Sequence, residues 1–333
     1  MKLPEFEYLA PGNLDEAVAL LSQHSGSAAL LAGGTDIVDR LKKRLVNPSY
    51  MISLKNLGEL NYIRQDEEKV LIGSMTPLVS IIESGVINGD FQALGQAAKL
   101  IGAPTIQHFR GTIGGNLCLE TRCIYYNQSA TWRSGRTRCH KDQGEICYAE
   151  ENSDRCRSAN QSDGACALMA LGAEIVLASK EKRRTIPIEE FFTGKGEAPF
   201  ALEPDEMIAE IQLTSTKEKH GSSFKKLTYR SAIDFALVSA AVYIVVKDGE
   251  ISKTRIAMGG AGAAPLFLKE ASETLEGKTI SDITAINEVA EKVIKHTSPF
   301  MVDNLGSTLE YRQKMSGVMV KRALKEALER VES

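Results

Sequence analysis

A short apolar run that leads into two adjacent glycines constrains the fold of this chain more than any other feature. Residues 28–31 are apolar and few enough for one buried strand, Gly33 and Gly34 permit a tight turn, and residues 36–43 have helical spacing. Adjacent glycines also let consecutive backbone N–H groups converge on an anion, because no Cβ blocks its approach. The stretch AGGTD therefore predicts an α/β unit with an anion site at its turn.

A second glycine motif, GTIGGN, occupies residues 111–116. Each motif contains a threonine, Thr35 or Thr112, whose hydroxyl can donate to a phosphate oxygen. One such loop fits a plain strand-to-helix turn equally well, whereas two loops on two α/β units suit two phosphates or a pyrophosphate held between lobes. The GxGxxG and GxxxxGK[ST] fingerprints are absent from the sequence, which disfavours a nicotinamide-binding Rossmann domain and a P-loop NTPase.

The length and pattern of the remaining chain predict two or three domains. Small α/β units fill the N-terminal part. A separate α+β domain is expected from about residue 220, with a hairpin that turns at Asp248 and Gly249 and two later helices, residues 283–296 and 308–331. A formal net charge of -3 without a basic tail makes nucleic acid an unexpected partner. The sequence has no apolar run of the roughly 18 residues that span a bilayer and no apolar signal core, so a cytoplasmic location without membrane contact is expected.

Four of the six cysteines lie in one polar stretch, spaced C-x15-C-x7-C-x8-C from Cys123 to Cys156. Three interpretations are open at this point: an iron–sulfur cluster, a structural zinc site, or a disordered insertion with incidental thiols. Zinc sites more usually contain C-x2-C pairs, and this stretch has none, while its aromatic residues, Trp132 among them, count against disorder. Cys118 and Cys166 are flanked by apolar residues and are expected to behave as small hydrophobic side chains.

Six motifs occur in the order typical of the FAD-binding medium subunits of molybdenum hydroxylases, the flavoproteins related to carbon monoxide dehydrogenase and xanthine dehydrogenase. They are AGGTD, IGSMTPL, RGTIGGNLC, SDGACALMALGAE, FFTG and FKKLTYRSAIDFALVSAA. The chain resembles this family over nearly its whole length. The resemblance implies an α+β protein with a two-subdomain FAD-binding domain of the vanillyl-alcohol oxidase type, residues 1–55 and 56–218, and a C-terminal α+β domain, residues 219–333.

The resemblance also implies which residues bind FAD. The pyrophosphate loop would contain Leu30, Leu31, Ala32, Gly33, Gly34, Thr35 and Asp36, and the second phosphate loop would contain Thr112, Gly114, Gly115 and Asn116. Asp163 corresponds to the acidic residue at the ribityl chain, and Leu202 and Lys225 correspond to positions close to the isoalloxazine ring. None of these residues would act on the substrate of the complex, which would bind to another subunit.

Residues 120–161 are expected to be an insertion, because the family pattern after GTIGGN normally continues within a few residues. Flavoprotein subunits of the 4-hydroxybenzoyl-CoA reductase type are similar here: they carry an extra [4Fe–4S] cluster, and the match implies the ligands Cys123, Cys139, Cys147 and Cys156. It further implies a dimer of heterotrimers with a molybdenum-cofactor subunit and a [2Fe–2S] subunit, and ferredoxin as electron donor. Arg133 and Arg136 would then belong to a basic docking patch for ferredoxin.

Three functions are compatible with this sequence, and the first is favoured. In the first, electrons pass from ferredoxin through the cluster and FAD toward molybdenum, where a phenolic hydroxyl is removed from an aromatic CoA thioester. In the second, the chain is the FAD subunit of a xanthine dehydrogenase-like or other molybdenum hydroxylase with outward electron flow. In the third, it is a zinc-stapled nucleotide-binding subunit without a redox role.

Overall fold

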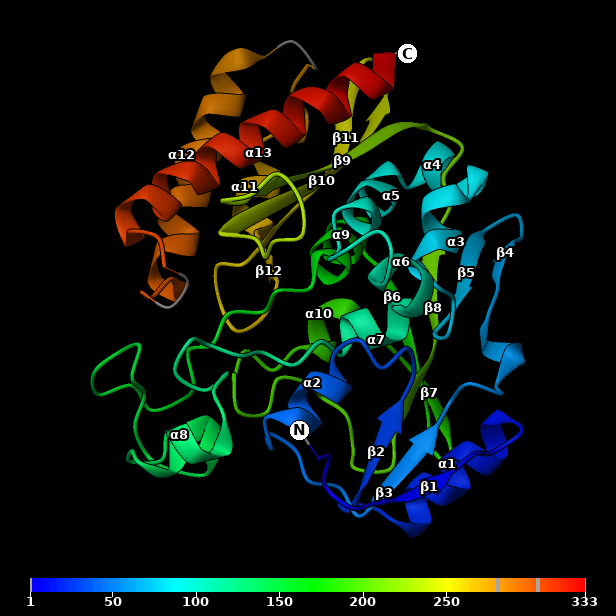
Figure 1. Ribbon diagram of the computed structural model, residues 1–333. Helices are drawn as coiled ribbons and strands as arrows, with labels where there is room; N and C mark the ends of the chain where they lie inside the picture. The colour runs from blue at the N-terminus through cyan, green and yellow to red at the C-terminus, as the bar shows by residue number, and fades with distance from the viewer. Residues whose placement is uncertain (1, 280–281, 304–305, 333) are drawn as a thin grey trace.

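The first sheet of the protein contains the predicted strand–turn–helix unit. The computed structural model describes residues 2–279, 282–303 and 306–332, and in it three parallel strands form a sheet of order β1-β3-β2 (Figure 1). The elements are β1 Glu7–Leu9, α1 Leu14–Gln23, β2 Ala28–Leu31, α2 Ile37–Lys42 and β3 Tyr50–Ser53. Asn13 caps α1, because its side-chain oxygen accepts a hydrogen bond of 2.9 Å from the backbone N–H of Glu16.

The second sheet is antiparallel and has the strand order β4-β5-β8-β6-β7. Its strands are β4 Ile63–Gln65, β5 Lys69–Gly73, β6 Glu174–Ala178, β7 Arg183–Pro187 and β8 Met207–Thr214. The helices of this region are η1 Gly58–Leu60, α3 Leu78–Glu83, α4 Gly85–Asp90, α5 Gln92–Lys99, α6 Gln107–Arg110, α7 Ile113–Leu117, α9 Asp163–Leu171 and α10 Ile188–Phe191. The chain leaves the sheet after β5 and returns at β6, so the second glycine motif and the cysteine-containing stretch both lie in one long excursion.

The third sheet is antiparallel, of order β12-β11-β10-β9, and separates two cores. Its region contains β9 Lys219–Leu227, β10 Val238–Lys247, β11 Glu250–Gly259, β12 Leu266–Phe267, α11 Lys269–Glu273, α12 Ile283–Thr297, η3 Ser298–Phe300 and α13 Leu309–Glu332. Asp248 and Gly249 have φ values of 52° and 86°, so the predicted hairpin turn is confirmed. Alternate residues of a strand point to opposite faces: Val242 belongs to the core with α12 and α13, and Tyr243 to the core with α5 and α9.

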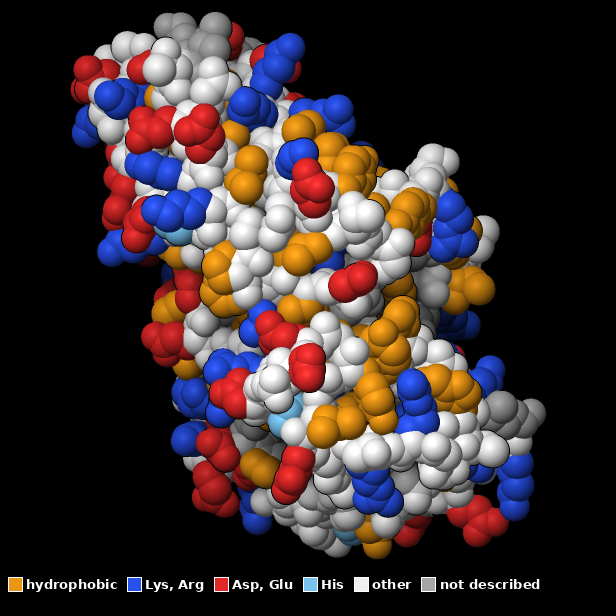
Figure 2. Space-filling view, turned by 90° about the vertical axis from the view of Figure 1, so that its left-hand side faces the viewer, with side chains coloured by type: hydrophobic (Ala, Val, Ile, Leu, Met, Phe, Trp, Pro, Cys, Tyr) orange, Lys and Arg blue, Asp and Glu red, His pale blue; other side chains and the backbone are white. Residues whose placement is uncertain are grey.

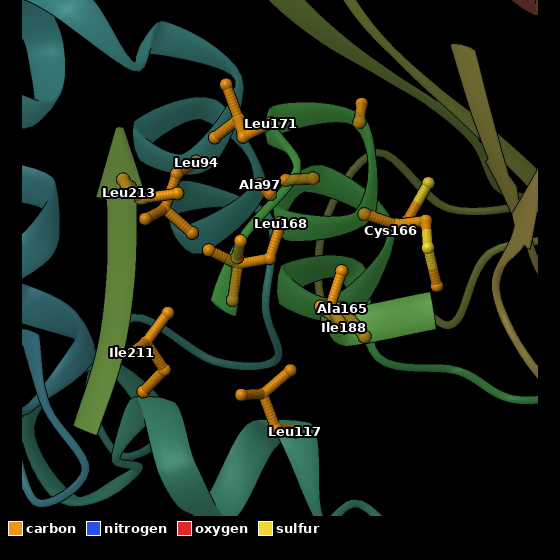
Figure 3. Packing of buried hydrophobic residues seen from close by; sticks show 14 of the residues in the cluster. Leu94, Ala97, Leu117, Ala165, Cys166, Leu168, Leu171, Ile188, Ile211 and Leu213 are labelled. Carbon is orange, nitrogen blue, oxygen red and sulfur yellow. The ribbon is translucent and has the colours of Figure 1, made fainter. Parts of the chain in front are cut away.

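Helix α9 lies at the centre of the larger core. All of its residues are buried, and Leu168 and Leu171 lie in one cluster with Leu94 of α5 and Leu213 of β8 (Figure 3). Cys166 is fully buried in this core, with its Sγ atom 3.6 Å from a backbone carbonyl oxygen of β11. It therefore behaves as the small hydrophobic side chain that its apolar neighbours predict.

The cysteine-containing insertion projects beside α2 at the lower left of Figure 1. Residues 121–157 contain one short helix, α8 Ala130–Ser134, one 3-10 turn, η2 His140–Asp142, and an isolated bridge between Cys139 and Ile146. Between residues 122 and 155 only Tyr126 is buried. The insertion thus has almost no apolar core of its own. In the part of the chain that the structure describes, no helix is both long and apolar enough to cross a membrane.

Candidate functional site

The two glycine loops line one pocket, which opens to solvent and has a cavity volume of about 340 Å³. The predicted residues that line it are Leu30, Ala32, Gly33, Gly34, Thr35, Asp36, Thr112, Gly114, Gly115 and Asn116. The remaining predicted residues, Leu31, Asp163, Leu202 and Lys225, do not line it. The phosphate-loop predictions thus converge on a single space, although β3, β4, β5 and the helices from α2 to α6 lie between the two motifs in the sequence.

Glycine is needed at two positions of the first loop for two different reasons. A Cβ atom on Gly33 would lie only 1.6 Å from the backbone oxygen of Arg110, so this glycine lets the first loop pack against the chain just before the second loop. Gly34 has a φ of 78°, a left-handed conformation that glycine adopts without strain. Gly33 therefore brings the two loops together, rather than only leaving room for a ligand as its motif alone indicates.

The first loop presents a row of unused hydrogen-bond donors. Within the described chain, the backbone N–H groups of Gly33, Gly34, Thr35 and Asp36 donate to no protein acceptor. Consecutive N–H groups of this kind form a concave anion site. This observation fits the phosphates of FAD.

The second loop is built differently, because the backbone N–H groups of residues 113–116 already donate within the protein. Thr112 caps α7 through a hydrogen bond of 3.2 Å that its hydroxyl oxygen accepts from the N–H of Gly115, and the N–H of Gly114 donates to a backbone carbonyl. The Asn116 side chain is turned toward α9, where its Oδ1 atom accepts from the Ser162 hydroxyl at 2.8 Å. This loop offers a ligand the hydroxyl proton of Thr112 and its backbone N–H, which has no acceptor among the described residues, but not a row of free N–H groups.

Two arginines supply positive charge to the pocket, and both were absent from the sequence-based prediction. Arg40 and Arg122 line the pocket. Arg122 contacts Asp36 at 2.5 Å, and the Nε atom of Arg40 is buried without a partner among the described residues. Burial raises the pKa of Asp36, although the two arginines oppose this effect. An unused buried arginine N–H beside free backbone donors again fits a phosphate group.

Of the residues predicted near the ribityl chain and ring of the flavin, Asp163 lies at the N-terminus of α9. Asp163 is buried and forms an ion pair of 2.6 Å with Lys226, whose Nζ atom also donates to the backbone oxygen of Leu100 at 3.0 Å. Burial raises the pKa of Asp163 to about 6 despite this partner. Lys225 points to the opposite face of β9 and pairs with Glu326 of α13.

Lys226 is therefore the lysine that pairs with Asp163, a contact that the sequence reasoning missed. The period of two along a strand shows that neighbouring lysines face opposite sides, but not which of them faces α9. Leu202 is partly buried at the edge of the larger core. The roles of Asp163, Leu202 and Lys225 stay predictions.

The four cysteines of the insertion line one second pocket, together with Tyr125, Tyr148, His140 and Lys141. Cys118 lines the first pocket and Cys166 lies in the core. Burial raises the pKa of the Cys123 thiol, and the neighbouring Cys139 and Cys147 thiols act in the same direction. No three His, Cys, Asp or Glu side chains of the described residues lie in an arrangement that would hold a metal ion. The four thiols thus share a pocket, but they do not converge on a single metal position.

The two arginines predicted for ferredoxin docking differ in their exposure. Arg133 has only 11% of its side chain exposed, pairs with Asp142 at 3.6 Å, and donates to the backbone oxygens of Lys43 and Arg44. Its predicted docking role is wrong, because these contacts leave little of its side chain exposed to a partner. Arg136 is exposed but stacks on Trp132. Basic and acidic side chains are intermingled on the face shown in Figure 2, with no single continuous basic patch.

Comparison with known proteins gives matches over nearly the whole chain. Residues 4–214 match the family described as "FAD binding domain in molybdopterin dehydrogenase", and residues 222–327 match "CO dehydrogenase flavoprotein C-terminal domain". The medium chain of carbon monoxide dehydrogenase from Hydrogenophaga pseudoflava is 30% identical over 324 residues, covering 97% of each chain. The nicotinate dehydrogenase FAD-subunit of Eubacterium barkeri is 29% identical, covering 96% of this chain and 95% of its own.

The fold matches as well. A structure of carbon monoxide dehydrogenase from Hydrogenophaga pseudoflava, which lacks the Mo-pyranopterin moiety, superimposes with a TM-score of 0.81 at 30% identity and covers 99% of both chains. The predicted fold, an FAD-binding domain followed by a C-terminal domain of the CO dehydrogenase flavoprotein type, is confirmed. The individual boundaries at residues 55 and 218 stay predictions.

Proposed function

This chain belongs to the FAD-binding medium subunits of the molybdenum hydroxylases, and from that premise we propose that it is the flavin and iron–sulfur subunit of a complex of the 4-hydroxybenzoyl-CoA reductase type. Its partners in this proposal are a molybdenum-cofactor subunit and a [2Fe–2S] subunit, in a dimer of heterotrimers. Ferredoxin is the electron donor, and the substrate, an aromatic CoA thioester, binds to another subunit. The chain itself conducts electrons.

The observation that carries the proposal is the shared pocket of Cys123, Cys139, Cys147 and Cys156. The matched families describe flavin binding alone, so the cluster rests on this pocket. A single zinc ion at about 2.3 Å from each sulfur would draw four thiolates toward one centre. Four thiolates on the corners of a four-iron cluster stand further apart. Four thiols that share a pocket without converging on one point therefore favour a [4Fe–4S] cluster over zinc.

The chain's own residues are suited to hold FAD. The free N–H groups of residues 33–36 and the guanidinium groups of Arg40 and Arg122 would bind the phosphates, and the Thr112 hydroxyl would add a donor. When bound, FAD supplies exchange of one or two electrons, which joins a one-electron carrier to a two-electron reaction. We propose that Lys226 takes the ring-side role that the resemblance assigned to Lys225. Asp163 holds Lys226, which also donates to Leu100, the residue directly before pocket residues 101 and 102.

A second candidate function is the FAD subunit of a molybdenum hydroxylase with outward electron flow. The named relatives favour it, because those with specified substrates are dehydrogenases of carbon monoxide and nicotinate. The two candidate functions differ in the direction of electron transfer. A complex of the first type is reduced by ferredoxin and then removes the phenolic hydroxyl of 4-hydroxybenzoyl-CoA, whereas one of the second type is reduced by its substrate and passes electrons to an acceptor.

Analysis of metal, sulfide and flavin in the purified protein tests the proposal. We expect iron and acid-labile sulfide in equal amounts, together with FAD. Serine in place of each insertion cysteine should deplete iron, while Cys118→Ser and Cys166→Ser should retain it. Zinc without sulfide, or equal iron loss in Cys118→Ser, would contradict the cluster assignment.

A further inference from the structure

The insertion contacts the helix that follows the pyrophosphate loop at three successive places. Arg122 donates to Asp39 of α2 at 2.9 Å, in addition to its contact with Asp36. Asn127 accepts a hydrogen bond of 2.9 Å from the ammonium group of Lys43. These contacts follow α2 from its first turn to its end, where the insertion and α2 lie side by side (Figure 1).

Arg133 completes this set of contacts just after the end of α2. Its guanidinium donates to the backbone oxygens of Lys43 and Arg44 at 3.2 and 2.9 Å. Arg44 has a φ of 56°, a conformation that a non-glycine residue adopts only when its surroundings hold it there. We call Arg122, Asn127 and Arg133 the brace.

Helix α2 depends on the brace because it has few other contacts. Its six residues include one buried side chain, Leu41. Asp36, at the start of α2, is also the last residue of the loop whose free N–H groups line the flavin pocket. A shift of α2 would therefore move the phosphate-binding donors directly.

The brace in turn depends on the cysteine pocket. Between residues 122 and 155 the insertion buries only Tyr126, so its apolar burial is too small to offset the conformational entropy of ordering this segment. A cofactor bound by residues that are far apart in a disordered chain contributes its binding free energy to folding. Filling the pocket of the four cysteines would order the insertion and with it the brace.

We propose that occupancy of the four-cysteine pocket controls FAD affinity through the brace, so that the subunit acquires the metal site first and releases FAD when the metal site is lost. This inference rests on the proposed function, since it takes iron as the occupant. The coupling is reciprocal by thermodynamic necessity. Bound FAD should therefore slow the loss of iron to a chelator.

FAD titrations of the full chain, followed by quenching of flavin fluorescence, test the coupling. Iron-free protein, prepared with a chelator and kept reduced, should bind FAD about tenfold more weakly than iron-loaded protein. Arg133 lines neither pocket, and Arg133→Met removes one part of the brace. The iron-loaded form of this variant should therefore show a similar loss of FAD affinity. Removing iron from Arg133→Met should weaken FAD binding by less than about a further twofold, because both changes act on one structural element.

Arg138→Met is the matched control. Arg138 is an exposed insertion arginine without an ion pair in the described structure, and its replacement should leave FAD affinity unchanged. Asn127→Ala is a milder change at the same contact surface and replaces Arg133→Met if that variant does not fold. An unchanged FAD affinity after iron removal, or in both brace variants, would overturn the inference.

Failure of the inference can be told apart from failure of the proposed function. If the wild-type protein binds no iron, the cluster assignment fails, and the comparison of Arg133→Met with Arg138→Met still decides whether the brace controls FAD affinity. If iron and FAD both bind but neither affects the other, the proposed function stands and the coupling is wrong.

Discussion

Replacing Lys226 with methionine would leave a buried carboxylate without its partner. The side chains of Lys226 and Asp163 are only 4% and 5% exposed, and their charged atoms lie 2.6 Å apart. Methionine keeps most of the aliphatic volume and removes the charge. The neighbouring Lys225 provides a matched control, because its ion pair with Glu326 is much more exposed.

The size of the effect follows from the titration of Asp163. Burial raises its pKa from 3.8 to about 6 even with Lys226 present. A carboxyl with a raised folded pKa contributes stability that is present below its unfolded pKa and is lost as pH rises through the folded pKa. Removing Lys226 raises the folded pKa further, so the variant and the wild type diverge only above pH 6.

The extra destabilisation of Lys226→Met should therefore grow as the pH rises from 6 to 8, toward the roughly 3 kcal/mol typical of breaking a buried ion pair.

Urea unfolding of the flavin-free full chain at pH 6, 7 and 8 measures this difference. Lys225→Met should cost less than about 1 kcal/mol, because partly exposed ion pairs contribute little, and its cost should not change over this range. A Lys226→Met penalty that is constant from pH 6 to pH 8 would refute the reasoning, as would equal penalties for the two variants. The same pair, assayed for FAD content, decides which lysine belongs to the flavin site.

Three further predictions concern other parts of the molecule. Gly33→Ala should lose FAD but keep iron, because the new Cβ atom would meet the backbone of Arg110. The flavin released by acid precipitation measures this loss. In the control Gly85→Ala the new Cβ atom meets nothing, so this variant should keep both cofactors. Arg136→Glu should slow reduction by ferredoxin, because Arg136 is the exposed arginine of the two predicted for docking. Salt should diminish this effect, and reduction by a small neutral dye should not slow; equal slowing with both donors would place docking elsewhere. Arg312→Met should lower the melting temperature and cost about 3 kcal/mol, because it orphans three buried carbonyl oxygens; a change below about 1 kcal/mol would contradict this.

Local features of this protein could be predicted from the sequence because they depend on neighbouring residues. The strand from Ala28 to Leu31, the cap at Asn13 and the turn at Asp248 and Gly249 all lie where apolar periodicity and turn chemistry place them. The two glycine loops were also identified as partners, and they line one pocket. The local sequence was enough for these conclusions, because each concerns a few adjacent residues or a motif whose residue types themselves indicate a turn or an anion site.

Only the tertiary structure decided how distant segments meet. The spacing C-x15-C-x7-C-x8-C is compatible with several sites, and it took the fold to bring all four thiols to one pocket. Arg40 and Arg122 enter the flavin pocket from α2 and from the insertion, and no motif marks either of them. Which of two adjacent lysines faces Asp163 depends on the register of β9 against α9 and α13. The physical reason is the same in these cases. Local sequence determines which helix or strand forms, whereas the packing of whole helices and strands determines which distant side chains come into contact.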